Sequence, residues 1–163
     1  MIKCVNRNKY TGKYEVIYNW ADGLGTVEGT REMKVLGKDA VFDRVGSPYG
    51  KCVGEVGADG SCATVDQRSI PYYFEESDIT KEPSYHRYVV KEDFTKDNIY
   101  KKIEETVDEY YNKNTPYYGD NDGLAYGEIA PMFDGTGGGY QYDMPLNMNQ
   151  LIAIKMIEEI HNY

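Results

Sequence analysis

The sequence is poor in the residues that most often bind metal ions. It holds only two histidines and three cysteines, and Cys4, Cys52 and Cys62 form no C-x-x-C pair. A structural zinc site needs four such ligands, usually in closely spaced pairs, so we expect no metal site. Cys52 and Cys62 would fit a bridge across a hairpin in an oxidising compartment, but one thiol would be left over. We therefore expect reduced cysteines, as buried thiols.

Long apolar runs and positive charge are scarce as well. No run approaches the roughly 20 residues that cross a bilayer, and the N-terminal MIKCVNRNKY lacks the apolar stretch of a signal peptide. The 18 Lys and Arg against 27 Asp and Glu give a net charge of −9, which opposes attraction to a phosphate backbone. We expect no membrane anchor in this segment and no nucleic-acid partner.

What is present fits an ordinary globular protein. Hydrophobic residues make up 40% and charged residues 28% of the 163 residues, a length and composition that predict one domain over residues 1–163. The unusual feature is 17 tyrosines beside 4 phenylalanines and 1 tryptophan. Aromatic rings with a hydroxyl suit half-buried strands and ligand clefts.

The residue pattern changes from strand-like to helix-like along the chain. Alternating polar and apolar residues, glycine-punctuated segments and β-branched or aromatic runs predict strands in 10–20, 39–64, 70–75, 85–90 and 124–130. Residues 26–36 fit no single pattern. Apolar residues at helical spacing predict a helix over 96–112, capped by Thr95 or Asp97. A last helix is expected from Asn147 or Asn149 onward, with one apolar side made by Leu151, Ile154, Ile157 and Ile160.

Three clusters hold the residues that suit chemistry. They are AVFDRVGSPYG at 40–50, QRSIPYYF at 67–74 and GEIAPMFDGTGGGYQY at 127–142. Arg44 and Arg68 stand beside glycine- or proline-rich turns, where a forked guanidinium can grip a phosphate. Taken singly, each arginine is better explained by a surface ion pair, and His86 by packing within a strand. GTGGG is explained as well by a mobile turn as by a ligand contact.

Read in order, these strings resemble the tuberculosis necrotizing toxin (TNT) family. The likeness rests on YNWADGLGTVEGTREMKVLGKDAVFDRVGSPYG, QRSIPYYF, YHRYVV, GEIAPMFDGTGGGYQY and NQLIAIKMIEEI, and spans residues 18 to about 160. The family pattern runs through a D-R-[FY]-G turn, an R-x-[LI]-P segment, a Tyr-His strand and a terminal A-P-W-F-x-x-x-G-G-G-x-Q signature. Here Val45 and Met132 replace two of its aromatic residues.

The resemblance implies an NAD⁺ glycohydrolase that acts as the toxic part of a secreted bacterial effector in the cytoplasm of a target cell. It implies an α+β fold with a small, twisted, mainly antiparallel sheet, two principal helices and a cleft lined by the GTGGGYQY loop. NAD⁺, or NADP⁺, is then the substrate and no cofactor is needed. A producing cell would need a cognate immunity protein.

Motif by motif, the resemblance assigns roles to individual residues. Gln141, Arg44 and His86 match functional positions that we take as catalytic, and Arg68 matches a substrate-binding position. Beside these, the substrate would meet the glycine loop and an aromatic ring, for which the candidates are Tyr49, Tyr72, Phe133, Gly137, Gly138, Gly139 and Tyr140.

The chemistry of NAD⁺ cleavage is compatible with these residues. Nicotinamide leaves a cationic ring as a neutral base, so the enzyme needs to stabilise an oxocarbenium-like ribose and place a water molecule, without a general acid. An ADP-ribosyltransferase would direct the same cation to a macromolecular acceptor, and a degenerate dinucleotide-binding module would bind without turnover. These two remain the alternatives.

Overall fold

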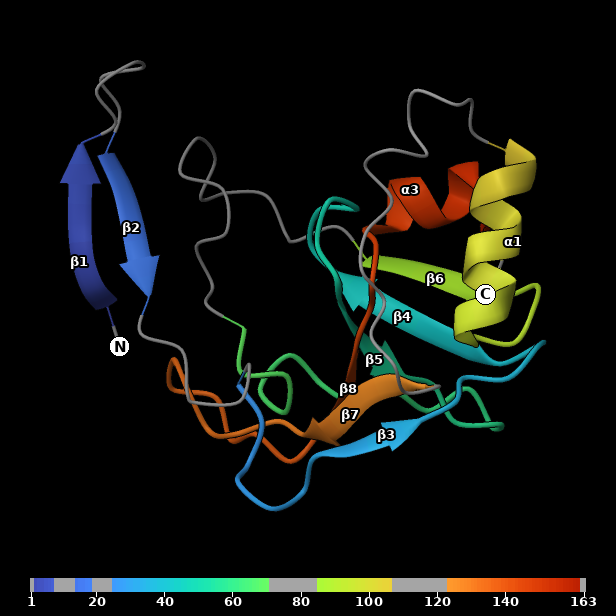
Figure 1. The fold of residues 1–163 in the computed structure, drawn as a ribbon. Coiled ribbons are helices and arrows are strands. Elements are labelled where there is room, and N and C mark those ends of the chain that lie inside the picture. Colours follow the sequence, from blue (N-terminus) through green and yellow to red (C-terminus); the bar gives the residue numbers. More distant parts are fainter. Residues whose placement is uncertain (1, 8–13, 19–24, 71–84, 107–122, 162–163) are drawn as a thin grey trace.

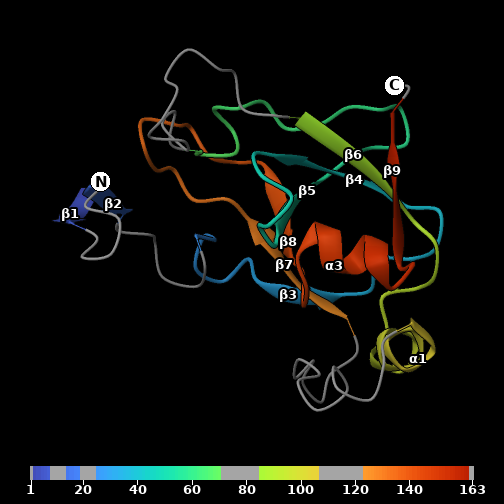
Figure 2. The same cartoon turned by 90° about the horizontal axis from the view of Figure 1, so that it is seen from above.

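The computed structural model describes residues 2–7, 14–18, 25–70, 85–106 and 123–161. Every strand pair in this part is antiparallel, and the sheet is not closed into a barrel. The seven strands of the main sheet follow the order β3-β7-β8-β5-β4-β6-β9 (Figures 1 and 2). They are β3 (Glu32–Lys34), β4 (Val41–Val45), β5 (Cys52–Glu55), β6 (Tyr85–Val90), β7 (Leu124–Glu128), β8 (Tyr140–Asp143) and β9 (Ile157–Ile160). The expected α+β class is confirmed.

The N-terminal strands form a sheet of their own. β1 (Ile2–Arg7) and β2 (Tyr14–Tyr18) pair with each other (Figure 1). β2 confirms the strand expected within 10–20, whereas β1 was not predicted. The strand expected at 70–75 lies, apart from Ile70, outside the described residues.

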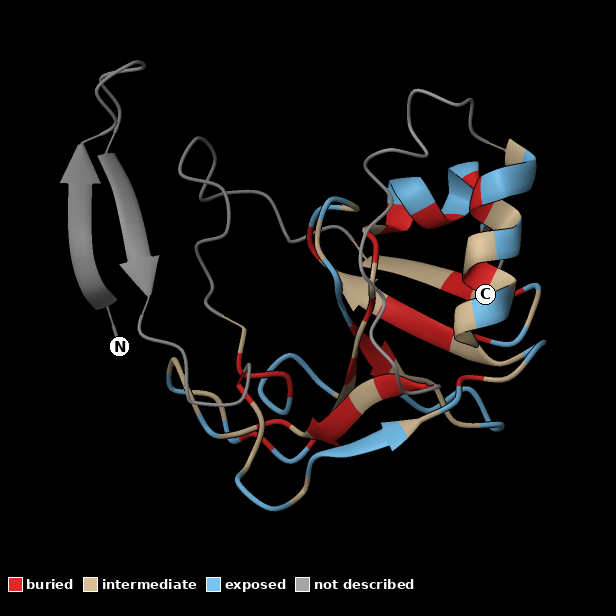
Figure 3. Ribbon diagram, in the orientation of Figure 1, coloured by how far each residue is buried: buried red, intermediate tan, exposed pale blue. Residues whose placement is uncertain are grey.

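Two helices cover one face of the main sheet. α1 (Lys96–Thr106) and α3 (Met148–Ala153) bury Ile99, Ile103, Met148 and Leu151 in the same core as Phe42, Val53, Tyr88 and Tyr142 from the strands. In Figure 3 the buried side of α3 faces the sheet and its exposed side faces away. Each large apolar side chain so buried stabilises the fold by about 1.5–3 kcal/mol. We call this side of the sheet the helix face, and the other side the open face.

The ends of both helices follow local sequence signals. Thr95 caps α1, because its Oγ1 accepts a hydrogen bond from the backbone N–H of Asn98. Asn147 caps α3 through a capping box with Gln150, in which each side chain bonds the other's backbone N–H. Neither described helix is long and apolar enough to cross a membrane.

The last helix ends earlier than the apolar spacing predicted. α3 stops at Ala153, and Ile157–Ile160, expected on its apolar side, form β9 instead. Lys155 takes a left-handed φ of 61°, which breaks the helix, and the isoleucines that follow suit a strand. Pairing of β9 with β6 therefore outweighs the helical period.

Two further expectations need correction. Gln141 lies in strand β8, not in a loop, so only residues before Tyr140 form the glycine loop. Cys52 and Cys62 are free, as expected, but both are exposed and not buried.

Candidate functional site

A row of four residues crosses the open face of the sheet. Arg87 is the Cα partner of Asp43 across β6 and β4, Asp43 that of Gly54 on β5, and Gly54 that of Gln141 on β8. Opposed residues of an antiparallel ladder point to the same side. The neighbours Phe42, Val53 and Tyr142 are buried on the helix face, so the row faces away from the helices.

Asp43 is the buried centre of this row. Its side chain is 0% exposed, and its Oδ2 accepts hydrogen bonds from Arg68 Nη2 at 2.6 Å and from the Tyr85 hydroxyl at 2.9 Å. Its Oδ1 is buried without a hydrogen-bond partner. Removing one member of such a buried pair costs about 3–5 kcal/mol, so Asp43 and Arg68 hold each other in place.

Gly54 makes room for this ion pair. A Cβ there would lie 2.5 Å from both Asp43 Oδ1 and Arg68 Nη1, closer than side-chain atoms approach. The strand can therefore pass beneath the two charged groups only with glycine at this position. Arg68 Nη1 has no hydrogen bond to the described residues, whereas Arg68 Nε donates to the Ala63 carbonyl at 2.9 Å.

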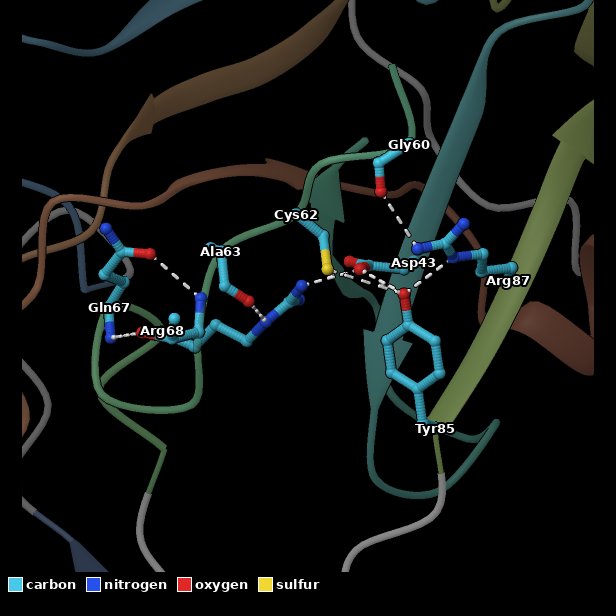
Figure 4. A network of polar contacts seen from close by, with 9 residues as sticks. Asp43, Gly60, Cys62, Ala63, Gln67, Arg68, Tyr85 and Arg87 are labelled. Carbon is cyan, nitrogen blue, oxygen red and sulfur yellow. Dashed lines mark hydrogen bonds and ion pairs between the residues drawn. The ribbon is translucent and has the colours of Figure 1, made fainter. Parts of the chain in front are cut away.

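Tyr85 links Asp43 to Arg87, as Figure 4 shows. A carboxylate only accepts hydrogen bonds, so the Tyr85 hydroxyl donates its proton to Asp43 and accepts from Arg87 Nε at 2.8 Å. Burial and the Asp43 carboxylate raise the pKa of Tyr85 to about 12, which keeps the hydroxyl protonated. Arg87 Nη2 also donates to the Gly60 carbonyl at 3.1 Å.

The glycine loop packs against the turn that carries Arg68. The backbone N–H groups of Gly137 and Gly139 donate to the carbonyls of Asp66 and Gln67, both at 3.2 Å. A Cβ at Gly137 would collide with the backbone of 129–131, and one at Gly139 would lie 2.9 Å from the Ala63 Cβ, whereas Gly138 has open space around it. GTGGG is thus a docked loop in this structure, and it ends two residues before Gln141.

A side chain also joins the loop to the turn. The Ser69 hydroxyl accepts from the Met132 N–H at 3.1 Å. Ser69 and Phe133 both have left-handed φ angles, of 46° and 51°, and Phe133 is half-buried. The structure therefore gathers Arg68, Phe133, the three glycines and Gln141 from two distant parts of the sequence.

Arg44 lies on the helix face, away from this group. Its Nε and Nη1 donate to the carbonyls of Ser47 and Cys52, both at 2.6 Å, so backbone carbonyls hold the arginine at the end of β4. A Cβ at Gly50 would lie 1.7 Å from Arg44 Nη2, so that glycine admits the guanidinium. Burial lowers the pKa of Arg44, and it pairs with no carboxylate among the described residues.

His86 lies opposite Arg44 on β6 and shares its face. Its Nδ1 is 2.6 Å from Glu159 Oε1 on β9, and because the carboxylate can only accept, Nδ1 is the donor. The Nε2 of His86 and the hydroxyl of Tyr88 are buried without hydrogen-bond partners. Strand β9, where the sequence predicted a helix, thus supplies the partner of His86.

The candidate aromatic residues are dispersed. Tyr49 is 74% exposed, and Tyr140, 41% exposed, stacks on Tyr126 with ring centroids 5.3 Å apart. Tyr72 lies outside the described residues. Phe133 is half-buried and stands two residues before the GTGGG run that packs against the Arg68 turn, so it remains a candidate for the substrate-stacking ring.

The described residues contain no group of three or more His, Cys, Asp and Glu side chains that could hold a metal ion. The polar network of the open face has none of the geometry of a metal site. What it offers is hydrogen-bond donors, an amide and one buried carboxylate.

Sequence reasoning missed Asp43, Gly54, Tyr85 and Arg87. Two signals were available: an acid inside the apolar strand AVFDRV, and the i, i+2 pair of Tyr85 and Arg87, which places both side chains on one face of a strand. Neither signal shows that Asp43 forms an ion pair with Arg68.

No protein family model and no curated protein sequence matches the chain. Among solved structures, it is similar to tuberculosis necrotizing toxin (TNT) in complex with its immunity factor. The TM-score is 0.53 at 17% sequence identity, over 90% of this chain and 63% of the toxin chain. At that identity the likeness concerns the fold, and this chain spans less than two thirds of the toxin chain.

Proposed function

We propose that this domain is an NAD⁺ glycohydrolase toxin, which hydrolyses the bond between nicotinamide and ribose to give nicotinamide and ADP-ribose. The observation that carries the proposal is the open-face row. In this row Gln141 on β8 is the cross-strand partner of Gly54, over which the Asp43–Arg68 ion pair lies, and it follows the docked glycine loop. The fold is similar to that of a known toxin, which supports the proposal.

In this proposal Gln141 acts at the ribose. As the glycosidic bond breaks, its electron pair goes to the pyridinium nitrogen and neutralises it, and positive charge develops on the ribose. Water then attacks C1′ and releases a proton to solvent. The Gln141 amide holds a ribose hydroxyl or the attacking water, in a fixed position that needs little rearrangement during the reaction.

Arg68 supplies positive charge for the pyrophosphate. Its Nε and Nη2 are held by Ala63 and Asp43, and the side chain is only 6% exposed. Nη1, which lies over Gly54, is the nitrogen that a phosphate oxygen would have to reach. A charge-assisted hydrogen bond of this kind contributes about 1.5–3 kcal/mol. The catalytic roles of Arg44 and His86 stay predictions. Both side chains lie on the helix face, on the opposite side of the sheet from Gln141 and Arg68.

The proposal includes the setting of the reaction. A domain that destroys NAD⁺ acts in the cytoplasm of a target cell, as part of a secreted bacterial effector, and its producer needs a cognate immunity protein. The solved toxin of similar fold is bound to an immunity factor, which supports this partner class.

The test is incubation of the purified protein with NAD⁺ and, separately, NADP⁺, with nicotinamide and ADP-ribose measured directly. Equal release of both products without an added acceptor supports hydrolysis. A strict requirement for a protein or nucleic-acid acceptor would mean a transferase, and binding without turnover would mean a binding module. Glu55→Gln, whose carboxylate bonds Lys34 and Tyr126 on the helix face, is the control variant.

A further inference from the structure

The open-face row crosses four neighbouring strands and is long enough to contact both ends of a dinucleotide. Arg87, Asp43, Gly54 and Gln141 occupy one position each on β6, β4, β5 and β8. Neighbouring strands are about 4.8 Å apart, so Arg87 and Gln141 stand about 14 Å apart along the row. Arg68 lies between them, bonded to Asp43 and over Gly54.

A chain of hydrogen bonds fixes the orientation of Arg87. Every donor in this chain is determined, because the Asp43 carboxylate at its end can only accept. Arg87 donates to the Tyr85 hydroxyl, Tyr85 donates to Asp43, and Asp43 receives Arg68 on the same oxygen. The Arg87 guanidinium also lies over the Tyr85 ring, with Cζ 5.7 Å from the centroid. These bonds, with that of Arg87 Nη2 to the Gly60 carbonyl, hold the positive charge of the guanidinium in one place, where it can attract a phosphate.

We propose that Arg87 is a substrate-binding residue for the adenylate-side phosphate of the dinucleotide, and that Asp43 positions it through the Tyr85 hydroxyl. This inference rests on the proposed function. It gives the substrate a direction: the nicotinamide ribose lies over β8 at Gln141, the pyrophosphate passes Arg68, and the adenylate end lies over β6.

The first experiment is a double-mutant cycle of Tyr85→Phe and Arg87→Ala, with KM and kcat measured for NAD⁺. Tyr85→Phe keeps both partners of the Asp43–Arg68 ion pair and removes the hydroxyl that links Asp43 to Arg87, together with its contact with Cys62 Sγ at 3.8 Å. Each single variant is expected to raise KM about 10-fold with little change in kcat, because phosphate contacts exist in both ground and transition states. The double variant is expected to be no worse than either single variant, since Tyr85 acts through Arg87.

The second readout uses nicotinamide mononucleotide, which has the same scissile bond and lacks the adenylate. Its KM is expected to be unchanged in Arg87→Ala and Tyr85→Phe. KM effects that multiply in the double variant, or a KM for the mononucleotide that rises as much as that for NAD⁺, would overturn the assignment. Glu55→Gln is the matched control, a carboxylate that also joins a cation to a tyrosine hydroxyl, but on the other face.

A third measurement separates this inference from the proposed function. If the wild-type protein releases no nicotinamide from NAD⁺, the proposed function fails, and the positioning is judged by NMR of the arginine Nε–H groups. Tyr85→Phe is expected to remove solvent protection from the Arg87 Nε–H and keep that of Arg68. Retention of both signals would show that Tyr85 does not position Arg87.

Discussion

Gln141 carries the sharpest prediction at the scale of single residues. Gln141→Ala is expected to lower kcat by at least about 10²-fold, the order of magnitude for one lost transition-state contact. The fold should persist, because Gln141 is half-buried on the open face and outside the helix-face core. Circular dichroism and thermal unfolding check the fold, and a variant with near-normal turnover would end the catalytic role of Gln141.

Arg44 is tested through a neighbour that touches nothing else of the candidate site. Gly50→Ala would bring a Cβ to 1.7 Å from Arg44 Nη2 and must displace the guanidinium. If Arg44 binds substrate, Gly50→Ala and Arg44→Ala should raise KM for NAD⁺ by similar factors. Gly37→Ala is the control, because its new Cβ would make only an ordinary contact, 3.6 Å from Asp93 Oδ1. Unchanged KM in both variants would leave Arg44 a structural residue of the β4 turn.

The sequence shows which residues suit chemistry better than which face they occupy. Arg44 and Arg68 were equivalent as arginines beside turns, yet one pairs with backbone carbonyls on the helix face and the other with Asp43 beneath the open face. That difference depends on strand register, because a shift of one residue exchanges the two faces. Register is set by distant strands and is invisible in a local pattern.

At the scale of elements, the sheet curves over its helix face. Glu55 on β5 lies three strands from Lys34 on β3, about 14 Å in a flat sheet, yet their charged atoms are 3.0 Å apart. The Tyr126 hydroxyl on β7 donates to the other oxygen of Glu55 at 2.6 Å. One carboxylate therefore joins three strands across a concave surface.

The stability of this junction should depend on pH. Partial burial would raise the pKa of Glu55, but the hydrogen bonds from Tyr126 and Lys34 and the Lys34 charge outweigh it, so the pKa lies below its ordinary value of 4.5. A carboxylate with a lowered folded-state pKa contributes stability above the unfolded-state pKa and loses it as pH falls. The wild-type protein should therefore lose stability below about pH 4.5 more steeply than Glu55→Gln. Parallel urea denaturation curves from pH 3 to 7 measure this, and identical slopes for the two proteins would contradict it.

The elements themselves were predicted unevenly for physical reasons. β6 and α1 have a clean strand or helix period and an evident cap, and both form where expected, α1 over the described part of its range. Over Leu151–Ile160 the apolar spacing fits a helix. The second half forms a strand instead, because β6, more than sixty residues earlier in the chain, provides a sheet edge with which it pairs. Tertiary pairing of this kind overrides a local period.

At the scale of the whole molecule, the net charge of −9 stands against a proposed site that contains Arg68 and Arg87. An immunity protein that blocks the site should insert acidic or aromatic side chains near Arg68 and the Gly137–Gly139 loop, and near Arg44 if it covers the turn after β4. Complementary charge speeds association, and a buried ring anchors the complex. Hydrogen exchange of the inhibited complex should show protection at these residues. An exposed loop in that complex would exclude direct occlusion.

The docking of the glycine loop on the Arg68 turn bears on when the site exists during folding. The two hydrogen bonds join segments roughly seventy residues apart, and contacts of such long sequence separation form late, after the loop-closure entropy has been overcome. A complete but unfolded chain therefore has every residue of the site without its geometry, and a nascent chain lacks the later residues as well. The proposed activity can begin only after the glycine loop and β8 have been synthesised and the loop has docked on the Arg68 turn. Copies of the protein that end before this loop should therefore be inactive.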